Sequence, residues 1–435
     1  MSHRPFVRRA DDIGEGGESS PVALPPPLTI KRHMSGRQIH EEERASTPLE
    51  LLFDLTAVVA VAAAATRLHH GLAAGEMQEA MVDFIQAFFV VWWPWMSYTW
   101  FASAYDTDDV PFRLATLVQM IGVLLIAIGI PQEAGGGAAG IVGFFLMRAT
   151  LVVQWCRAAS EHAERRHTCL RYAVAIGLLQ LLWLARAGWL PASWHLHSFA
   201  VLAICELAVP VWAARAGETP WHAHHVAERY GLFTIILLGE CMVASANAIS
   251  SALATGGWSL DLAVASVSII GLIMGLWWAY FLIPFAQVLQ LHRERGFLWG
   301  YGHALVFITL AALGGVLEVV ADALKGGAAH VATAHVRAGA VPDVALPDFA
   351  MGMVAATVGV FFAALWWLGG QSTRRQARNP KYVLPVLLAC VAAWFLVHRG
   401  LPLPWGLLTV AVGPVALIGW VTRDRLRRPE HFAVR

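Results

Sequence analysis

The chain has 435 residues, of which 57% are hydrophobic and 14% are charged, and its formal net charge is +1. Soluble domains carry roughly 25% charged residues, so this composition excludes an ordinary soluble domain and indicates a multi-pass membrane protein. The near-zero charge gives no support for nucleic-acid binding. The five cysteines form no CxxC pair, so we expect neither a disulfide framework nor a structural metal site, and no cofactor is predicted.

The first 45 residues are rich in Gly, Pro, Glu and Arg and contain no apolar segment typical of a signal peptide. This composition predicts a disordered cytoplasmic tail over residues 1–45. A second, shorter cytoplasmic tail is predicted over residues 422–435.

Twelve segments are apolar and long enough to cross a bilayer, which requires about 20 residues in a helix. The predicted fold class is therefore all-α, a polytopic membrane protein with about 12 transmembrane helices, and its first partner is the lipid bilayer. The predicted spans are 48–68, 80–102, 111–130, 138–158, 169–188, 195–214, 222–249, 260–283, 297–322, 348–370, 381–398 and 403–421.

Basic residues alternate between the predicted loops. The loops on the side of both termini carry 25 of the 31 Lys and Arg residues, and the opposite side carries five. Because Lys and Arg collect in cytoplasmic loops, we expect both termini to be cytoplasmic.

Two halves of the chain show a weak similarity. Glu50 opens the first span and Glu228 opens the seventh, and the span after each carries a Trp pair, Trp92-Trp93 or Trp277-Trp278. One interpretation is a duplication into two parallel six-helix halves, residues 46–214 and 215–421. The other is chance, because the chain contains 19 Trp.

The stretch "TPLELLFDLT" at the start of the first span contains two carboxylates. Thr47, Pro48 and Glu50 match a capping box, in which the Glu side chain returns to the amide of the cap residue. Asp54 lies one turn deeper, beyond the amides that capping satisfies. It is therefore either a hydrated carboxylate near the membrane surface or part of a polar site within the bilayer.

The seventh span, "HAHHVAERYGLFTIILLGECMVASAN", supplies a second deep carboxylate. Glu240 lies about 18 Å along the helix from Glu228, at 1.5 Å per residue. A carboxylate at this depth requires a partner, a proton or water. His224 and Glu228 have the i,i+4 spacing of a metal-binding pair, but hydrated side chains near the surface are the simpler interpretation.

A third feature is the cation Arg148 in the middle of the fourth span. Its candidate partners are Glu240, Glu206 and Asp54, as an ion pair or as a contact for a substrate anion. His303 in the ninth span is a further candidate. The predicted transport or polar site comprises Asp54, Glu240, Arg148, Glu206, Glu50 and His303.

The tract "YDTDDVPFR" places three carboxylates between the second and third spans. They can cap the next helix and form a turn, or bind a cation or pair with Arg113. With the start of the seventh span, the predicted cytoplasmic-face motif comprises Asp106, Asp108, Asp109, Arg113, His224, Glu228 and Arg229. No nucleophile–base pair or phosphate-binding motif is present in the sequence, so no catalytic residue is assigned and an enzyme is not favoured.

Four stretches resemble the low temperature requirement protein A (LtrA) family of bacterial membrane proteins over roughly residues 46–400. They are "TPLELLFDLTAVVAV", "YTWFASAYDTDDVPFRLATLVQMIGVLLIAIGIP", "HHVAERYGLFTIILLGECMV" and "YGHALVFITLAALGG". The resemblance implies a bacterial cytoplasmic membrane location and a link to growth in the cold, but no molecular activity. The family's acidic motifs correspond to Glu50, Asp54, Asp106, Asp108, Asp109, Glu228 and Glu240.

The function that we expect is a proton- or cation-linked transporter or channel for an unknown small solute or ion, using carboxylates within the membrane. Two alternatives are an intramembrane enzyme acting on a lipid or lipid-linked substrate and a non-catalytic membrane stress or scaffold protein. The sequence does not predict the oligomeric state.

Overall fold

The computed structural model describes residues 29–37, 44–132, 137–329, 346–372 and 380–427. The described residues form helices and no strand, and ten of the helices are long and apolar enough to cross a membrane. α2 is outside that set because its tryptophans and polar residues lower its mean hydropathy. α12 is outside it because it has only 15 residues. The predicted all-α, polytopic membrane fold is confirmed.

Six long helices form the first helix group. Three-residue 3₁₀ turns, η1 (Ala163–Arg165) and η2 (Ala192–Trp194), precede the fifth and sixth. The six helices are α1 (Pro48–Ala73), α2 (Met77–Tyr105), α3 (Val110–Gly129), α4 (Gly137–Glu161), α5 (Arg166–Trp189) and α6 (His195–Ala214).

The second helix group contains six more long helices and one short one. The short helix α9 and the turn η3 (Arg293–Arg295) were not predicted, because seven residues are too few for an apolar pattern to stand out. The helices are α7 (Ala223–Gly256), α8 (Leu260–Phe281), α9 (Phe285–Leu291), α10 (Gly296–Ala329), α11 (Leu346–Ser372), α12 (Leu384–His398) and α13 (Leu403–Arg427).

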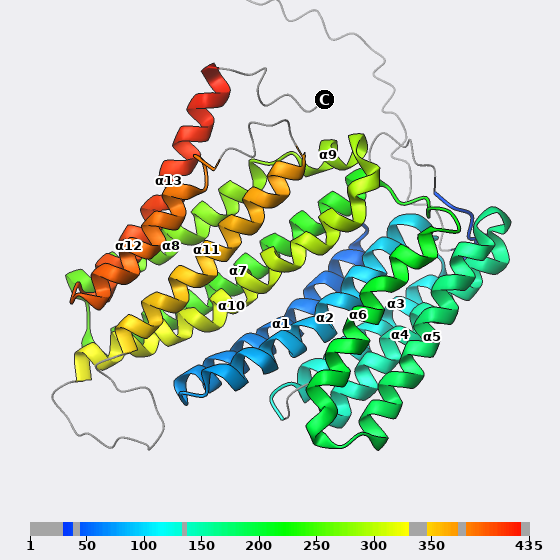
Figure 1. The fold of residues 1–435 in the computed structure, drawn as a ribbon, viewed down its shortest axis with the longest axis horizontal. Coiled ribbons are helices and arrows are strands. Elements are labelled where there is room, and N and C mark those ends of the chain that lie inside the picture. Colours follow the sequence, from blue (N-terminus) through cyan, green and yellow to red (C-terminus); the bar gives the residue numbers. More distant parts are fainter. Residues whose placement is uncertain (1–28, 38–43, 133–136, 330–345, 373–379, 428–435) are drawn as a thin grey trace, which may run out of the picture.

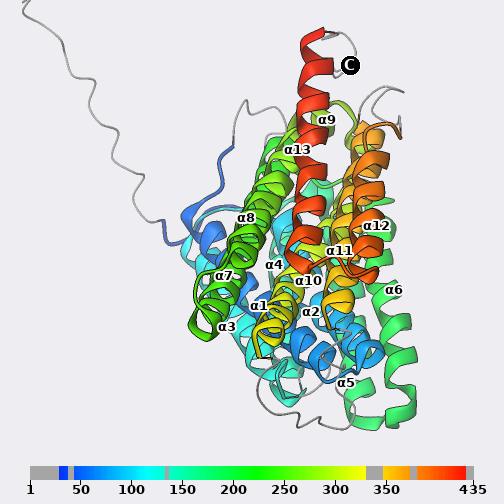
Figure 2. The same ribbon diagram turned by 90° about the vertical axis from the view of Figure 1, so that its left-hand side faces the viewer.

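The two helix groups lie side by side, with α1, α2, α7 and α10 between them (Figure 1). α1 packs against α2 and α3 of its own group and against α7 and α10 of the other. Of the apolar spans, the one containing α10 is the most buried, at 78%, whereas the span containing α6 is 33% buried. The interior is therefore centred on the contact between the groups, and α5 and α6 are peripheral (Figure 2).

The two groups share part of their packing order, although α8 packs extensively against α13 and α2 has no comparable contact with α6. α1 contacts α3, and α3, α4, α5 and α6 follow as successive neighbours; α7 contacts α10, and α10, α11, α12 and α13 follow likewise. The Trp pairs differ in environment, because Trp92 and Trp93 are buried whereas Trp277 and Trp278 are half-exposed. The packing order is consistent with two six-helix halves, which remain a proposal.

We call the end of the bundle at which α1, α3, α5, α7 and α10 begin the basic face; it is uppermost in Figure 1. Part of the predicted tail lies packed on this face rather than disordered. The backbone N–H of Met34 donates to Glu161 (2.6 Å), and Arg157 donates to the carbonyl oxygen of Arg32 (2.6 Å). Residues 1–28 and 38–43 lie outside the described residues.

The second predicted tail is also partly helical, since α13 extends to Arg427. Asp424 accepts hydrogen bonds from Lys381 (3.0 Å) and Tyr382 (2.7 Å), and Arg425 donates to the carbonyl oxygen of Leu282 (2.6 Å). These contacts fix the last turns of α13 beyond its apolar portion. Residues 428–435 lie outside the described residues.

Close contact between α3 and α4 depends on two glycines. A Cβ atom added at Gly143 would meet the carbonyl oxygen of Gly122 and would lie 3.0 Å from the backbone nitrogen of Ile126. Because these are backbone atoms, they cannot move aside as a flexible side chain could. Small residues allow the same close approach of helices in membranes generally.

We expect Gly143→Ala to destabilise the protein by about 1–3 kcal/mol, since the methyl group forces α3 and α4 apart. Thermal unfolding of the detergent-solubilised protein measures this. Gly177→Ala is the matched control, because no atom lies within 4 Å of a Cβ at Gly177. Equal unfolding temperatures for the two variants would contradict the proposed contact.

Candidate functional site

The start of α1 forms the capping box that its sequence predicts. The Thr47 hydroxyl accepts from the backbone N–H of Glu50 (3.3 Å), and Glu50 Oε2 accepts from the backbone N–H of Thr47 (2.8 Å). Capping is not the only role of this carboxylate, however. Glu50 also lies 3.1 Å from His225 Nε2 and 3.2 Å from Arg229 Nη1, both on α7, and all three side chains are fully buried.

Asp54 forms a two-bond ion pair with Arg229. Arg229 Nε donates to Asp54 Oδ2 (2.8 Å) and Nη2 donates to Oδ1 (2.5 Å), while Trp95 Nε1 on α2 donates to Oδ1 (2.7 Å). Both charged side chains have no exposed surface. Asp54 is therefore not a hydrated surface carboxylate but one half of a buried link between the two helix groups.

Arg44 and Asp106 extend these contacts toward the basic face. Arg44 Nη2 lies 3.3 Å from Asp106 and 3.9 Å from Glu50. Arg44 also donates to the carbonyl oxygens of Ser103 (2.6 Å) and Ala102 (3.1 Å), where a cation is favoured at the C-terminal end of α2. We name the six residues the α1–α7 charge network: Arg44, Glu50, Asp54, Asp106, His225 and Arg229.

Asp106 is the carboxylate of this network that lies outside the spans. Burial and the nearby Glu50 carboxylate raise the pKa of Asp106 to about 6, although Arg44 and the half-buried Arg37 partly offset them. Asp106 therefore exchanges a proton close to neutral pH, at the edge of a network whose other carboxylates are sealed from water.

The other two carboxylates of the Asp tract have partners of their own. Arg113 makes two bonds of 2.8 Å to Asp108, and this pair is partly exposed. Asp109 caps α3 by accepting from the backbone N–H of Phe112 (3.0 Å), and it accepts from Arg157 (2.6 Å). Each carboxylate of the tract thus faces a different arginine.

The predicted pair of His224 and Glu228 does not come together as a metal site. Glu228 accepts from the backbone N–H of Ser46 (3.1 Å), and it is His225 rather than His224 that faces Glu50. Within the ranges that the structure describes, no three His, Cys, Asp or Glu side chains are grouped to hold a metal ion.

Arg148 and Glu206 form a second buried ion pair, between α4 and α6. Arg148 Nη2 lies 2.5 Å from Glu206 Oε2, and Nη1 donates to the Ser97 hydroxyl (2.9 Å). Glu206 also accepts from three further donors: Trp93 (3.0 Å), Gln180 (3.3 Å) and Trp183 (3.3 Å). Among its three candidate partners, Arg148 therefore pairs with Glu206.

α2 separates the two ion pairs. Trp93 binds Glu206 and Trp95 binds Asp54, and residues two apart on a helix point about 200° apart. Asp54 and Arg148 consequently lie on opposite faces of α2, in separate networks rather than in one shared site.

Glu240 and His303 belong to neither network. Glu240 is half-buried and, among the described residues, has no hydrogen bond or ion pair. Around Gly239 there is open space rather than a close neighbouring helix. His303 is fully buried and lies against the rings of Trp299 (4.1 Å) and Phe285 (5.0 Å), with its Nδ1 2.9 Å from the carbonyl oxygen of Trp299.

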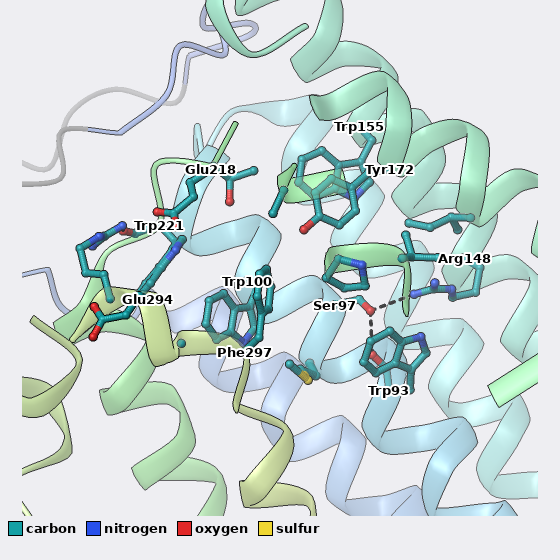
Figure 3. A pocket seen from close by; sticks show the side chains of 18 residues that line it. Trp93, Ser97, Trp100, Arg148, Trp155, Tyr172, Glu218, Trp221, Glu294 and Phe297 are labelled. Atoms are coloured by element: carbon teal, nitrogen blue, oxygen red, sulfur yellow. Dashed lines mark hydrogen bonds between the residues drawn. The ribbon is translucent and has the colours of Figure 1, made fainter. Parts of the chain in front are cut away.

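A cavity opens beside the Arg148–Glu206 pair, toward the basic face (Figure 3). The cavity is narrow, with a volume of about 60 Å³ open to the centre of a water-sized sphere, and it opens to solvent. Arg148 and Ser97 lie at its inner end, and Glu218 and Glu294 lie at its rim. Arg293, which precedes Glu294 in the chain, also lines it. We name it the aromatic cavity for the rings that line it, those of Trp93, Trp100, Trp155, Tyr172, Trp221 and Phe297.

Sequence reasoning missed two members of the charge network, Arg44 and His225, and also Trp95, which donates to Asp54. The i,i+4 spacing of His225 and Arg229, which repeats that of Glu50 and Asp54, is the signal that could have identified His225. Arg44 was assigned to a tail on composition, and no local pattern singles out Trp95 among its neighbouring tryptophans.

Comparison with known proteins places residues 45–417 within the sequence model of the bacterial low temperature requirement A protein family (LtrA). An uncharacterised protein of Rhizobium meliloti (strain 1021) is 27% identical over 265 residues, which are 57% of this chain and 61% of that protein. The chain thus spans less than two thirds of the length of this relative. No solved structure matches the chain.

The buried carboxylate Asp109 makes stability depend on pH. Burial alone would raise its pKa, but hydrogen bonds from Arg157 and from the backbone N–H groups of Arg32 and Phe112 outweigh burial and hold the pKa of Asp109 below its usual value. Its stabilising contribution is therefore complete above the ordinary Asp pKa of about 4 and is lost as the pH falls below it.

We expect Asp109→Asn to lower the free energy of unfolding at pH 7 by about 1.5–3 kcal/mol, the range for hydrogen bonds to charged groups. The difference from the wild type should shrink below about pH 4. Thermal unfolding between pH 3 and pH 7 measures this, with the partly exposed Asp108→Asn as control. A difference that does not change with pH would contradict the assignment.

The Asp54–Arg229 pair should behave as one unit. Arg229→Gln should cost about 3–5 kcal/mol, because it leaves buried carboxylates without their cation. Adding Asp54→Asn should recover a substantial part of that loss. A double-mutant cycle on unfolding measures the coupling, with the exposed pair Asp108→Asn and Arg113→Gln as control at about 0–1 kcal/mol. Additive effects at Asp54 and Arg229 would contradict a direct pair.

Proposed function

We propose that this chain, which belongs to the bacterial low temperature requirement A family, is a proton- or cation-linked transporter or channel. In this proposal the α1–α7 charge network is the element that responds to the transported ion. It takes both termini and the basic face to be cytoplasmic, as the distribution of Lys and Arg indicates.

The observation that carries this proposal is the way in which two carboxylates share one arginine. Glu50 and Asp54 both contact Arg229, and all three side chains are fully buried. Among the residues that the structure describes, the second negative charge is balanced by Arg44 at 3.9 Å or by a proton on His225 at 3.1 Å. A proton or a small cation can therefore bind this network and complete its charge balance.

The network is also well placed to convert ion binding into movement. Its contacts join α1 of the first helix group to α7 of the second. When a proton or cation neutralises Asp54 or Glu50, Arg229 loses a bonded partner and the α1–α7 contact favours a different arrangement. Transporters built from two helical halves move one half against the other about such an interface.

Purified protein in liposomes that contain a pH-sensitive dye tests this proposal. Wild-type protein should carry protons, or Na⁺ or K⁺ in matched ion gradients, faster than empty liposomes do. The double variant Asp54→Asn with Arg229→Gln should lose this flux, because it removes Asp54 and the arginine that Asp54 shares with Glu50, while Glu50 keeps Arg44 and His225 as neighbours. Glu240→Gln asks whether the deeper carboxylate of α7 also takes part.

The matched control is Asp108→Asn with Arg113→Gln, which removes an ion pair on the surface of the same end of the bundle. This control should transport ions like the wild type. Equal flux from the wild type and from the Asp54 and Arg229 double variant would rule out the carboxylate mechanism. Wild-type flux no greater than that of empty liposomes would rule out ion transport.

A further inference from the structure

We infer that the aromatic cavity binds a small solute with a flat apolar ring and a carboxylate group. The carboxylate would bind at the Nε–H of Arg148, beside Ser97, whose hydroxyl already donates to the carbonyl oxygen of Trp93 (2.9 Å). The ring would lie among the aromatic side chains nearer the opening. This inference rests on the proposed function only for the fate of the solute, which would be its transport, and not for the binding itself.

The inner end of the cavity has more hydrogen-bond donors than acceptors. The two oxygens of Glu206 already accept from four side chains. Arg148 is 1% exposed and lines the cavity, but only its two terminal nitrogens have partners, and its buried Nε–H has none. A buried donor without a partner is costly, so an acceptor oxygen is the group that this end of the cavity lacks.

The aromatic rings that line the cavity indicate that the part of the solute beyond its carboxylate is flat and apolar. Trp155 and Tyr172 stack with ring centres 4.2 Å apart and planes 5° apart, and Trp100 lies 4.9 Å from Trp221 and 5.8 Å from Phe297. Such faces bind planar apolar groups through stacking and edge contacts. Small-molecule sites commonly combine mainly apolar walls with a few placed polar groups.

Hydrogen-bonding capacity at the buried end of the cavity, rather than net charge, favours an anion over a cation. Glu218 and Glu294 at the rim are exposed to solvent, which screens them. Arg293, which also lines the cavity, has its guanidinium 4.0 Å from the ring of Trp221. The buried end, where interactions are strongest, presents a guanidinium and a carboxylate that four donors already bind. An ammonium group would meet no free acceptor there.

Solute binding is connected to the α1–α7 charge network by direct contacts. Trp100 lines the cavity and donates through Nε1 to the hydroxyl of Tyr230 (3.0 Å), and Tyr230 follows Arg229 on α7. Trp93 and Ser97 lie on α2 together with Trp95, which binds Asp54. A solute that reorients Trp100 or α2 therefore acts on Tyr230, which follows Arg229 in the chain, or on Trp95, which donates to Asp54.

Three probes with the same ring and different charges test the solute class. Indole-3-acetate is an anion, tryptamine is a cation and 3-methylindole is neutral. Binding to the full-length protein in detergent is measured by calorimetry. Indole-3-acetate should bind at least about tenfold more tightly than tryptamine, as one charge-assisted hydrogen bond would give. Equal or tighter binding of tryptamine would overturn the inference.

Variants locate the site. Arg148→Gln combined with Glu206→Gln removes both charges of the pair and should abolish the preference for indole-3-acetate while 3-methylindole still binds. Ser97→Ala is a milder change that removes the hydroxyl to which Arg148 Nη1 donates. It should alter the affinity for the anion alone, because it shifts the guanidinium, and it keeps the test decisive if the double variant does not fold. Trp100→Leu should weaken all three probes. Arg67→Gln, whose ion pair with Asp83 lies at the opposite face, should bind like the wild type.

Unchanged anion binding in both Ser97→Ala and Trp100→Leu would place the solute elsewhere and overturn the inference. The liposome assay separates this failure from a failure of the proposed function. Ion flux without binding of any indole probe would overturn the site and leave transport standing. Saturable binding that Ser97→Ala alters, in a protein without ion flux, would support the site and overturn transport.

Discussion

A charge inside a bilayer has no water to solvate it, so the position of each buried charge depends on its partner. In this protein the bond from Asp54 to Arg229 sets the position of α1 against α7. Glu50 and His225, one turn away on the same two helices, face each other as a result. Arg44 and Asp106 then complete the contacts at the surface. The pair thus anchors α1 to α7, beside the more extensive packing of α1 against α10.

These contacts explain why α2 contains a Trp-rich stretch. An indole ring offers a large apolar surface and a single N–H donor. Three rings of this stretch direct that donor to three places: Trp93 to Glu206, Trp95 to Asp54 and Trp100 to Tyr230. α2 thus satisfies carboxylates on both of its faces while remaining apolar, and it carries one wall of the aromatic cavity.

Local rules predicted most of the fold. Apolar length alone located the twelve long helices, and the Thr47 capping box follows from four consecutive residues. The partners of the buried charges could not be predicted in the same way, because Asp54 and Arg229 are 175 residues apart. Arg44 shows the opposite error, since composition assigned it to a tail although its charge is needed beside two buried carboxylates. Glu240 lies near the middle of α7, but the packing of the other helices leaves its side chain half-buried.

The separation of Asp54 and Arg229 along the chain has a consequence for biosynthesis. A ribosome delivers α1 to the membrane 175 residues before it delivers the cation that Asp54 requires. Until then α1 alone bears the cost of the carboxylate, about 2.5–3.5 kcal/mol at a helix centre on insertion scales and less near the surface. α1 therefore takes its final place only after α7 has entered the membrane, although α1 precedes α7 in synthesis.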